Sequence, residues 1–291
     1  ASDAQSGTVS VFSGAGDVSG DVLIGSGQAV SGPAGDVKVS AGGSSRGAGG
    51  SLLLNAGSSE ASDDSGGDIR IMSGDSSRGT SGAVSVESAS SASSGLLKMS
   101  SGVASAGSSG EVVIASGGAF DGKAGGISIA VGSGTVGAGG EILLSAGDTK
   151  DSHAAGGQLK LVSGAGADSG AVFLASADAI ASGESGAVSI ATGSSVAGAS
   201  GSMQISSGDS VDGQAGGLAL KAGRSGGDAD GASVVVAGGA GNAGAGGELR
   251  LVSGGSEVAA SGRVYLGSGV SGSDGASGDV IVGSGRSEER R

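Results

Sequence analysis

The feature that constrains this chain most is a short motif that recurs nineteen times along its 291 residues. Each copy holds two aliphatic residues separated by one residue, then almost always a small residue two positions later, and usually a glycine. A fixed period of this kind indicates a repeat architecture rather than a single globular core. The aliphatic pairs are Val9/Val11, Val22/Ile24, Val37/Val39, Leu52/Leu54, Ile69/Ile71, Val84/Val86, Leu97/Met99, Val112/Ile114, Ile127/Ile129, Ile142/Leu144, Leu159/Leu161, Val172/Leu174, Val188/Ile190, Met203/Ile205, Leu218/Leu220, Val234/Val236, Leu249/Leu251, Val264/Leu266 and Val280/Val282.

The composition excludes several other kinds of repeat protein. Glycine supplies 68 residues, and there is one proline and no cysteine. A flexible Gly/Ser linker has no reason to place aliphatic residues in register, and collagen needs glycine at every third position. The net charge of −13 argues against a nucleic-acid partner. No apolar run approaches the roughly 18 residues that span a bilayer, so we expect no membrane insertion.

Alternation at period two predicts a β-strand with both aliphatic side chains on one face. The glycine-rich stretches between strands are too short for crossover helices. We therefore predict an all-β fold, a parallel β-solenoid with about 30 residues and two motif copies per coil. It would have two main sheets around a narrow core of aliphatic and small residues; a coil of about 15 residues is the competing possibility. Residues 7–285 would form this single solenoid of nineteen half-coil units, between an N-terminal flank (1–6) and a charged tail (286–291).

The residue between the two aliphatics is expected to point outward, and its character changes from one copy to the next. In alternate copies it is mostly large and apolar, which predicts a lateral interface. The remaining copies carry several cations there, which predicts a polar, cationic face. The lateral set is Leu23, Leu53, Val113, Leu143, Phe173, Val235 and Tyr265, and the cationic set is Lys38, Arg70, Lys98, Lys160 and Arg250.

Nothing in the sequence indicates catalysis, a cofactor or a metal. His153 is the one histidine, and it lies in a corner segment rather than beside a recognisable nucleophile and acid. Calcium-binding repeats carry an aspartate-containing glycine motif in every turn. The acidic corners here, Asp63-Asp64 and Asp228-Ala-Asp230, do not recur. We expect a protein that is not an enzyme and that has no resident cofactor.

Units such as Ser185–Gly193 and Ala138–Gly147 resemble the Gly/Ser/Ala-rich tandem arrays of predicted secreted and cell-surface proteins of diatoms and related algae. The resemblance covers nearly the whole chain. It implies an extracellular or cell-surface location and a structural role, and it carries no catalytic residues.

Three functions are compatible with these features. The first is a structural subunit of an extracellular fibre, sheath or cell-surface appendage, which self-associates or pairs with paralogous solenoid chains. It would associate laterally through the apolar face and axially through uncapped ends. The second is an ice-binding solenoid, against which the five scattered threonines argue. The third is a surface adhesin that binds polysaccharide or mineral through the cationic face.

Overall fold

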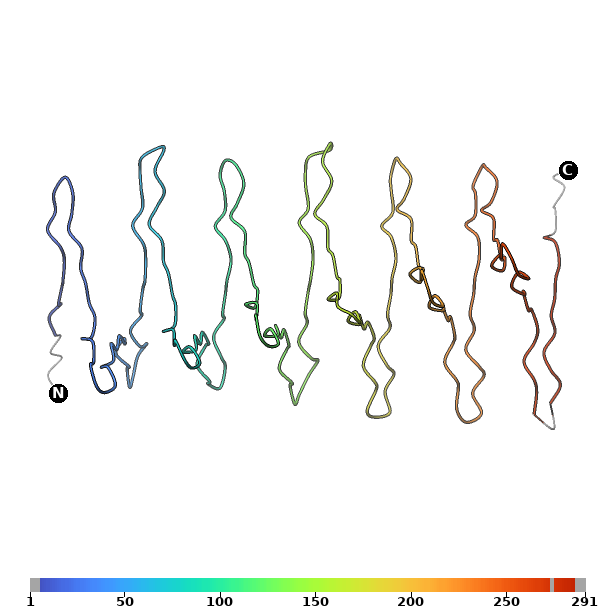
Figure 1. The fold of residues 1–291 in the computed structure, drawn as a ribbon, viewed down its shortest axis with the longest axis horizontal. Helices are drawn as coiled ribbons and strands as arrows, with labels where there is room; N and C mark the ends of the chain where they lie inside the picture. Colours follow the sequence, from blue (N-terminus) through green and yellow to red (C-terminus); the bar gives the residue numbers. More distant parts are fainter. Residues whose placement is uncertain (1–5, 273–274, 286–291) are drawn as a thin grey trace. The chain divides into compact units, whose positions relative to one another are not determined.

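The computed structural model describes residues 6–272 and 275–285, and across them the backbone is extended and interrupted by bends. These residues contain no α-helix and no β-strand, so there are no element bounds to give. The chain is accordingly drawn as a plain tube, without coiled ribbons or arrows (Figure 1). The predicted tail (286–291), and all but Ser6 of the predicted flank (1–6), lie outside the described residues.

The chain divides into two units, Ala1–Leu143 and Leu144–Arg291. Both units have the same local plan: an extended segment of several residues contains the aliphatic pair, and a bend separates it from the next segment. Some bends need glycine, because Gly107 and Gly137 adopt φ angles of 86° and 83°, which side chains with a Cβ disfavour. The bends of the first unit lie at 16–18, 30–32, 45–47, 61–63, 77–79, 91–93, 105–107, 120–122 and 135–138, and those of the second at 152–154, 166–168, 181–183, 196–198, 211–213, 227–228, 242–244, 257–259 and 275.

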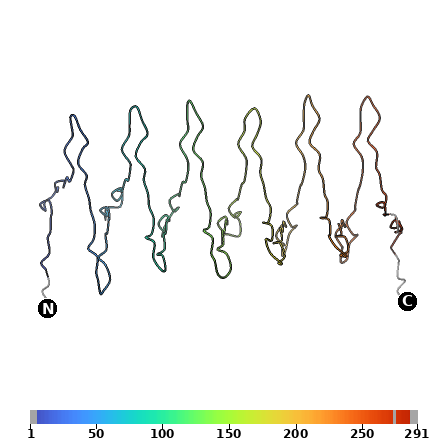
Figure 2. The same cartoon turned by 90° about the horizontal axis from the view of Figure 1, so that it is seen from below.

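Several of the loops are closed at their base by one backbone hydrogen bond. In the first unit, Gly50 N–H donates to the Gly42 carbonyl at 2.8 Å. In the second, Gly157 N–H donates to the Gly147 carbonyl at 2.9 Å. Narrow loops of this kind can be followed in both views (Figures 1 and 2). The same glycine-to-glycine bond joins Gly67 to Gly57, Gly82 to Gly74, Gly170 to Gly164, Gly247 to Gly239 and Gly262 to Gly254.

The predicted parallel β-solenoid is wrong. Within the described ranges no residue is assigned to a strand, so there are no sheets and no coils of 30 or of 15 residues. The narrow aliphatic core is also missing, because no hydrophobic side chain among these residues is buried.

The solenoid prediction failed because period-two alternation does not specify which segments pair. Alternation determines which side of an extended segment a residue occupies, but not which other segment supplies its hydrogen-bond partner. In seven loops the glycines expected to turn the chain into its next coil instead bond to one another across the loop base. Glycine also raises the conformational entropy lost when segments are ordered, by roughly 0.5–1 kcal/mol relative to alanine.

Candidate interaction surface

The aliphatic pairs form the main apolar feature of the chain, and they are exposed. In the second repeat Val22 and Ile24 are 50% and 79% exposed, and Leu23 between them is 87% exposed. In six other repeats, too, the residue between the two aliphatics is more exposed than either of them. These residues are Leu53, Val113, Leu143, Phe173, Val235 and Tyr265. The local backbone therefore places the two aliphatics on one side and the residue between them on the other.

The structure places the seven residues predicted to form a lateral interface on seven separate extended segments. All seven are exposed. Without a sheet in the described residues, no surface gathers them into the continuous row that the sequence predicts. Their role in an interface stays a prediction.

The predicted cationic residues are also exposed, each on its own segment. Lys38 makes an ion pair with Asp36, with 3.0 Å between Nζ and Oδ2. Both side chains are more than two-thirds exposed, so the pair contributes little to stability, at most about 1 kcal/mol. It does show that residues two apart reach each other on the side opposite the aliphatics.

The loop bases, which the sequence identified only as corners, are closely packed. A Cβ placed on Gly157 would lie 3.0 Å from the Gly147 nitrogen and 3.3 Å from the Ala146 Cβ. Ala146 is one of five half-buried residues in the described ranges. The other four are Ser13, Ser73, Ser163 and Ser225, of which the first three occupy the same place in their repeats as Ala146. The signal in the sequence is a small residue and a glycine at the start of the loop, and another glycine at its end.

A second local device, also missed from the sequence, is a serine that organises the bend. Ser44 Oγ accepts a hydrogen bond from Gly47 N–H, and Ser76 Oγ from Gly79 N–H, both at 2.9 Å. Such serine turns satisfy a backbone donor locally. The recurring Ser-x-x-Gly spacing is the signal that predicts them. The same bond joins Ser195 to Gly198, Ser210 to Gly213 and Ser256 to Ala259.

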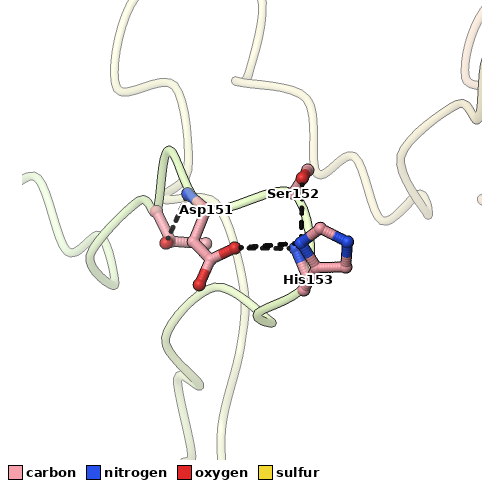
Figure 3. Close-up of polar contacts among 4 residues, drawn as sticks. Asp151, Ser152 and His153 are labelled. Carbon is pink, nitrogen blue, oxygen red and sulfur yellow. Dashed lines mark hydrogen bonds and ion pairs between the residues drawn. The ribbon is translucent and has the colours of Figure 1, made fainter.

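His153 lies in the one bend where a serine, a histidine and an aspartate meet (Figure 3). Ser152 Oγ lies 3.2 Å from His153 Nδ1, and Asp151 Oδ1 lies 3.5 Å from the same nitrogen. In a catalytic triad the nucleophile and the acid contact opposite ring nitrogens. Here Asp151 instead accepts the His153 backbone N–H at 2.9 Å, which is a turn contact.

Residues 6–272 and 275–285 show no cavity and no cluster of three or more potential metal ligands. Among these residues there is also no helix of the length and apolarity that crossing a membrane requires. Comparisons with protein-family models, with curated proteins and with solved structures found no match. The resemblance to algal repeat arrays stays a prediction.

Proposed function

We propose that this chain is a structural protein whose copies associate with one another to build an extracellular fibre, sheath or cell-surface appendage. The extracellular setting rests on the resemblance to secreted algal arrays. The association rests on the exposed aliphatic pairs.

The observation that carries the proposal is the exposure of the aliphatic pairs. Among the described residues every large hydrophobic side chain is exposed, and none is buried. Removing apolar surface from water contributes about 25 cal/mol per Å². Extensive exposed apolar surface in a protein marks a site of interaction. Contact with another chain supplies the burial that the described part of this one does not.

The backbone of the same segments points to the same kind of partner. Within the described ranges, the backbone hydrogen bonds lie at loop bases and in bends, so the extended segments use almost none of their donors and acceptors on one another. An extended segment with free N–H and C=O groups is a template for pairing with another extended segment. One contact then satisfies both the backbone and the aliphatic side chains.

A second copy of this chain is the partner that fits best. It presents a similar segment nineteen times, at intervals of 13 to 17 residues. Once one segment has paired, the others are held close to their partners, which raises overall affinity without any new type of contact. The net charge of −13 opposes association at low salt and keeps separate copies soluble.

Two matched sets of valine-to-serine substitutions test the proposal. The first set replaces six valines that begin aliphatic pairs and are 50–55% exposed: Val22, Val37, Val84, Val112, Val188 and Val234. The control set replaces six loop valines that are at least 91% exposed: Val18, Val30, Val103, Val136, Val196 and Val211. Because none of the twelve is buried in the single chain, neither set removes an internal core.

Association is measured by sedimentation velocity over a concentration series, with electron microscopy of the same samples. Burying the remaining half of one valine contributes about 1 kcal/mol, so the first set raises the midpoint concentration at least about a hundredfold. The control set leaves it within about threefold. A wild-type protein that stays monomeric at high concentration contradicts the proposal, as does an equal effect of the two sets.

A further inference from the structure

Charged residues are sorted between two positions of the repeat. We call the residue immediately before the first aliphatic the leading position, and the residue between the two aliphatics the middle position. The middle position holds five cations and no acid in nineteen repeats, whereas the leading position holds seven acids and one cation, Arg263. The leading acids are Asp21, Asp36, Asp68, Glu111, Glu141, Glu248 and Asp279.

In the third repeat these two positions share one side of the segment. The ion pair of 3.0 Å between Asp36 and Lys38 joins a leading residue to a middle residue. In the third repeat Val37, which lies between them, is 52% exposed, whereas their side chains are 72% and 84% exposed. The segment around Val37 therefore has an aliphatic side and a side with acid and cation two residues apart, and two further repeats, Asp68/Arg70 and Glu248/Arg250, carry the same two charges.

We infer that two copies pair with their extended segments antiparallel. The first aliphatic of a repeat in one copy then lies opposite the first aliphatic of a repeat in the other. The inference rests on the proposed self-association and specifies its orientation and register. Antiparallel pairing about Val37 places Asp36 of each copy opposite Lys38 of the other. Repeats that carry both charges, Asp68/Arg70 and Glu248/Arg250, match in the same way, with themselves or with one another.

Two other simple arrangements oppose like charges. Parallel pairing in register places Asp36 opposite Asp36 and Lys38 opposite Lys38. Antiparallel pairing about the middle position also places Lys38 opposite Lys38. Directly opposed like charges destabilise a pair of strands, and opposite charges stabilise it. Pairing about the first aliphatic is thus the register that the sorted charges favour.

The glycine two residues before the first aliphatic is compatible with this register. Antiparallel pairing about Val37 places Val39 opposite Gly35, and pairing about Ile69 places Ile71 opposite Gly67. A large aliphatic then faces a residue without a side chain, which leaves room for close approach of the two backbones. The first aliphatics face each other, which pairs apolar with apolar.

A charge-swap variant tests the orientation without altering composition or net charge. It exchanges the two residues in three repeats: Asp36→Lys with Lys38→Asp, Asp68→Arg with Arg70→Asp, and Glu248→Arg with Arg250→Glu. Wild-type and swapped chains are labelled separately with a donor or an acceptor fluorophore at the α-amino group. Energy transfer is then compared at low salt in three mixtures: wild type with wild type, swap with swap, and wild type with swap.

Antiparallel pairing about the first aliphatic predicts self-sorting. The two unmixed samples associate equally, whereas the mixed sample, which opposes acid to acid, associates about tenfold more weakly. Parallel pairing predicts the reverse, with the mixed sample strongest, and that result overturns the inference. Equal transfer in all three also overturns it but leaves self-association intact. If no sample associates, the proposed function itself fails.

Discussion

Replacing Gly157 with alanine opens the loop that this residue closes. Its N–H donates to the Gly147 carbonyl at 2.9 Å. The added Cβ lies 3.0 Å from the Gly147 nitrogen and 3.3 Å from the Gly147 carbonyl oxygen. Both distances are shorter than ordinary van der Waals contact, so the two sides of the loop base move apart. The net contribution of such a hydrogen bond is about 0.5–1.5 kcal/mol, which corresponds to an increase of roughly 2- to 13-fold in the opening of the loop.

Gly147→Ala is the matched control, because a Cβ at Gly147 meets nothing within 4 Å. This substitution keeps the bond, and it lowers the entropy of the open chain, which favours the closed loop slightly. The assay is the exchange rate of the residue-157 amide hydrogen by NMR, divided by the intrinsic rate for each sequence. Gly157→Ala increases this ratio several-fold, and Gly147→Ala leaves it unchanged or lowers it. Equal ratios for the two variants would refute the argument that close approach at the base requires glycine at position 157.

Two further predictions concern the bends and the net charge. Ser76→Ala removes the acceptor for the Gly79 N–H, so the exchange of that amide accelerates by about 2- to 13-fold, and Ser77→Ala, as the control, leaves it unchanged. Adding NaCl from about 0.02 to 0.5 M lowers the midpoint concentration for association, because ions screen the repulsion between copies that each carry a net charge of −13. Sedimentation at each salt concentration measures this, and association that weakens with salt would contradict a dominant aliphatic contact.

The local organisation of the repeat is readable from the sequence, but its pairing is not. Period-two alternation predicts that Val22 and Ile24 lie on the side opposite Leu23. In the structure both are less exposed than Leu23. The glycine-rich stretches mark the loops. The prediction went wrong where it stacked successive repeats into a solenoid. Alternation contains no information about which two segments lie side by side. Their pairing depends on contacts between residues that are far apart in the sequence.

For the candidate surface, too, the sequence predicts some features and not others. The residue types at the leading and middle positions are visible in the sequence, and so is the Ser-x-x-Gly spacing of the bends. The choice of which loops close with a glycine-to-glycine bond is not visible, because Gly20 and Gly50 occupy the same place in their repeats and only Gly50 makes the bond. Which charges lie opposite one another depends on a second chain. The lateral role of residues such as Phe173 and Tyr265 therefore stays a prediction.

Amide hydrogen exchange at two protein concentrations tests the central claim most directly. Extended segments such as 36–40 and 248–252 have no backbone partners within the described part of the chain, and in our proposal they gain them from another copy. Their amides should therefore exchange at nearly intrinsic rates in dilute monomer and become protected once the protein assembles. Strong protection of these segments that persists unchanged at the lowest concentration would contradict the account, because it would show that the single chain already supplies their partners.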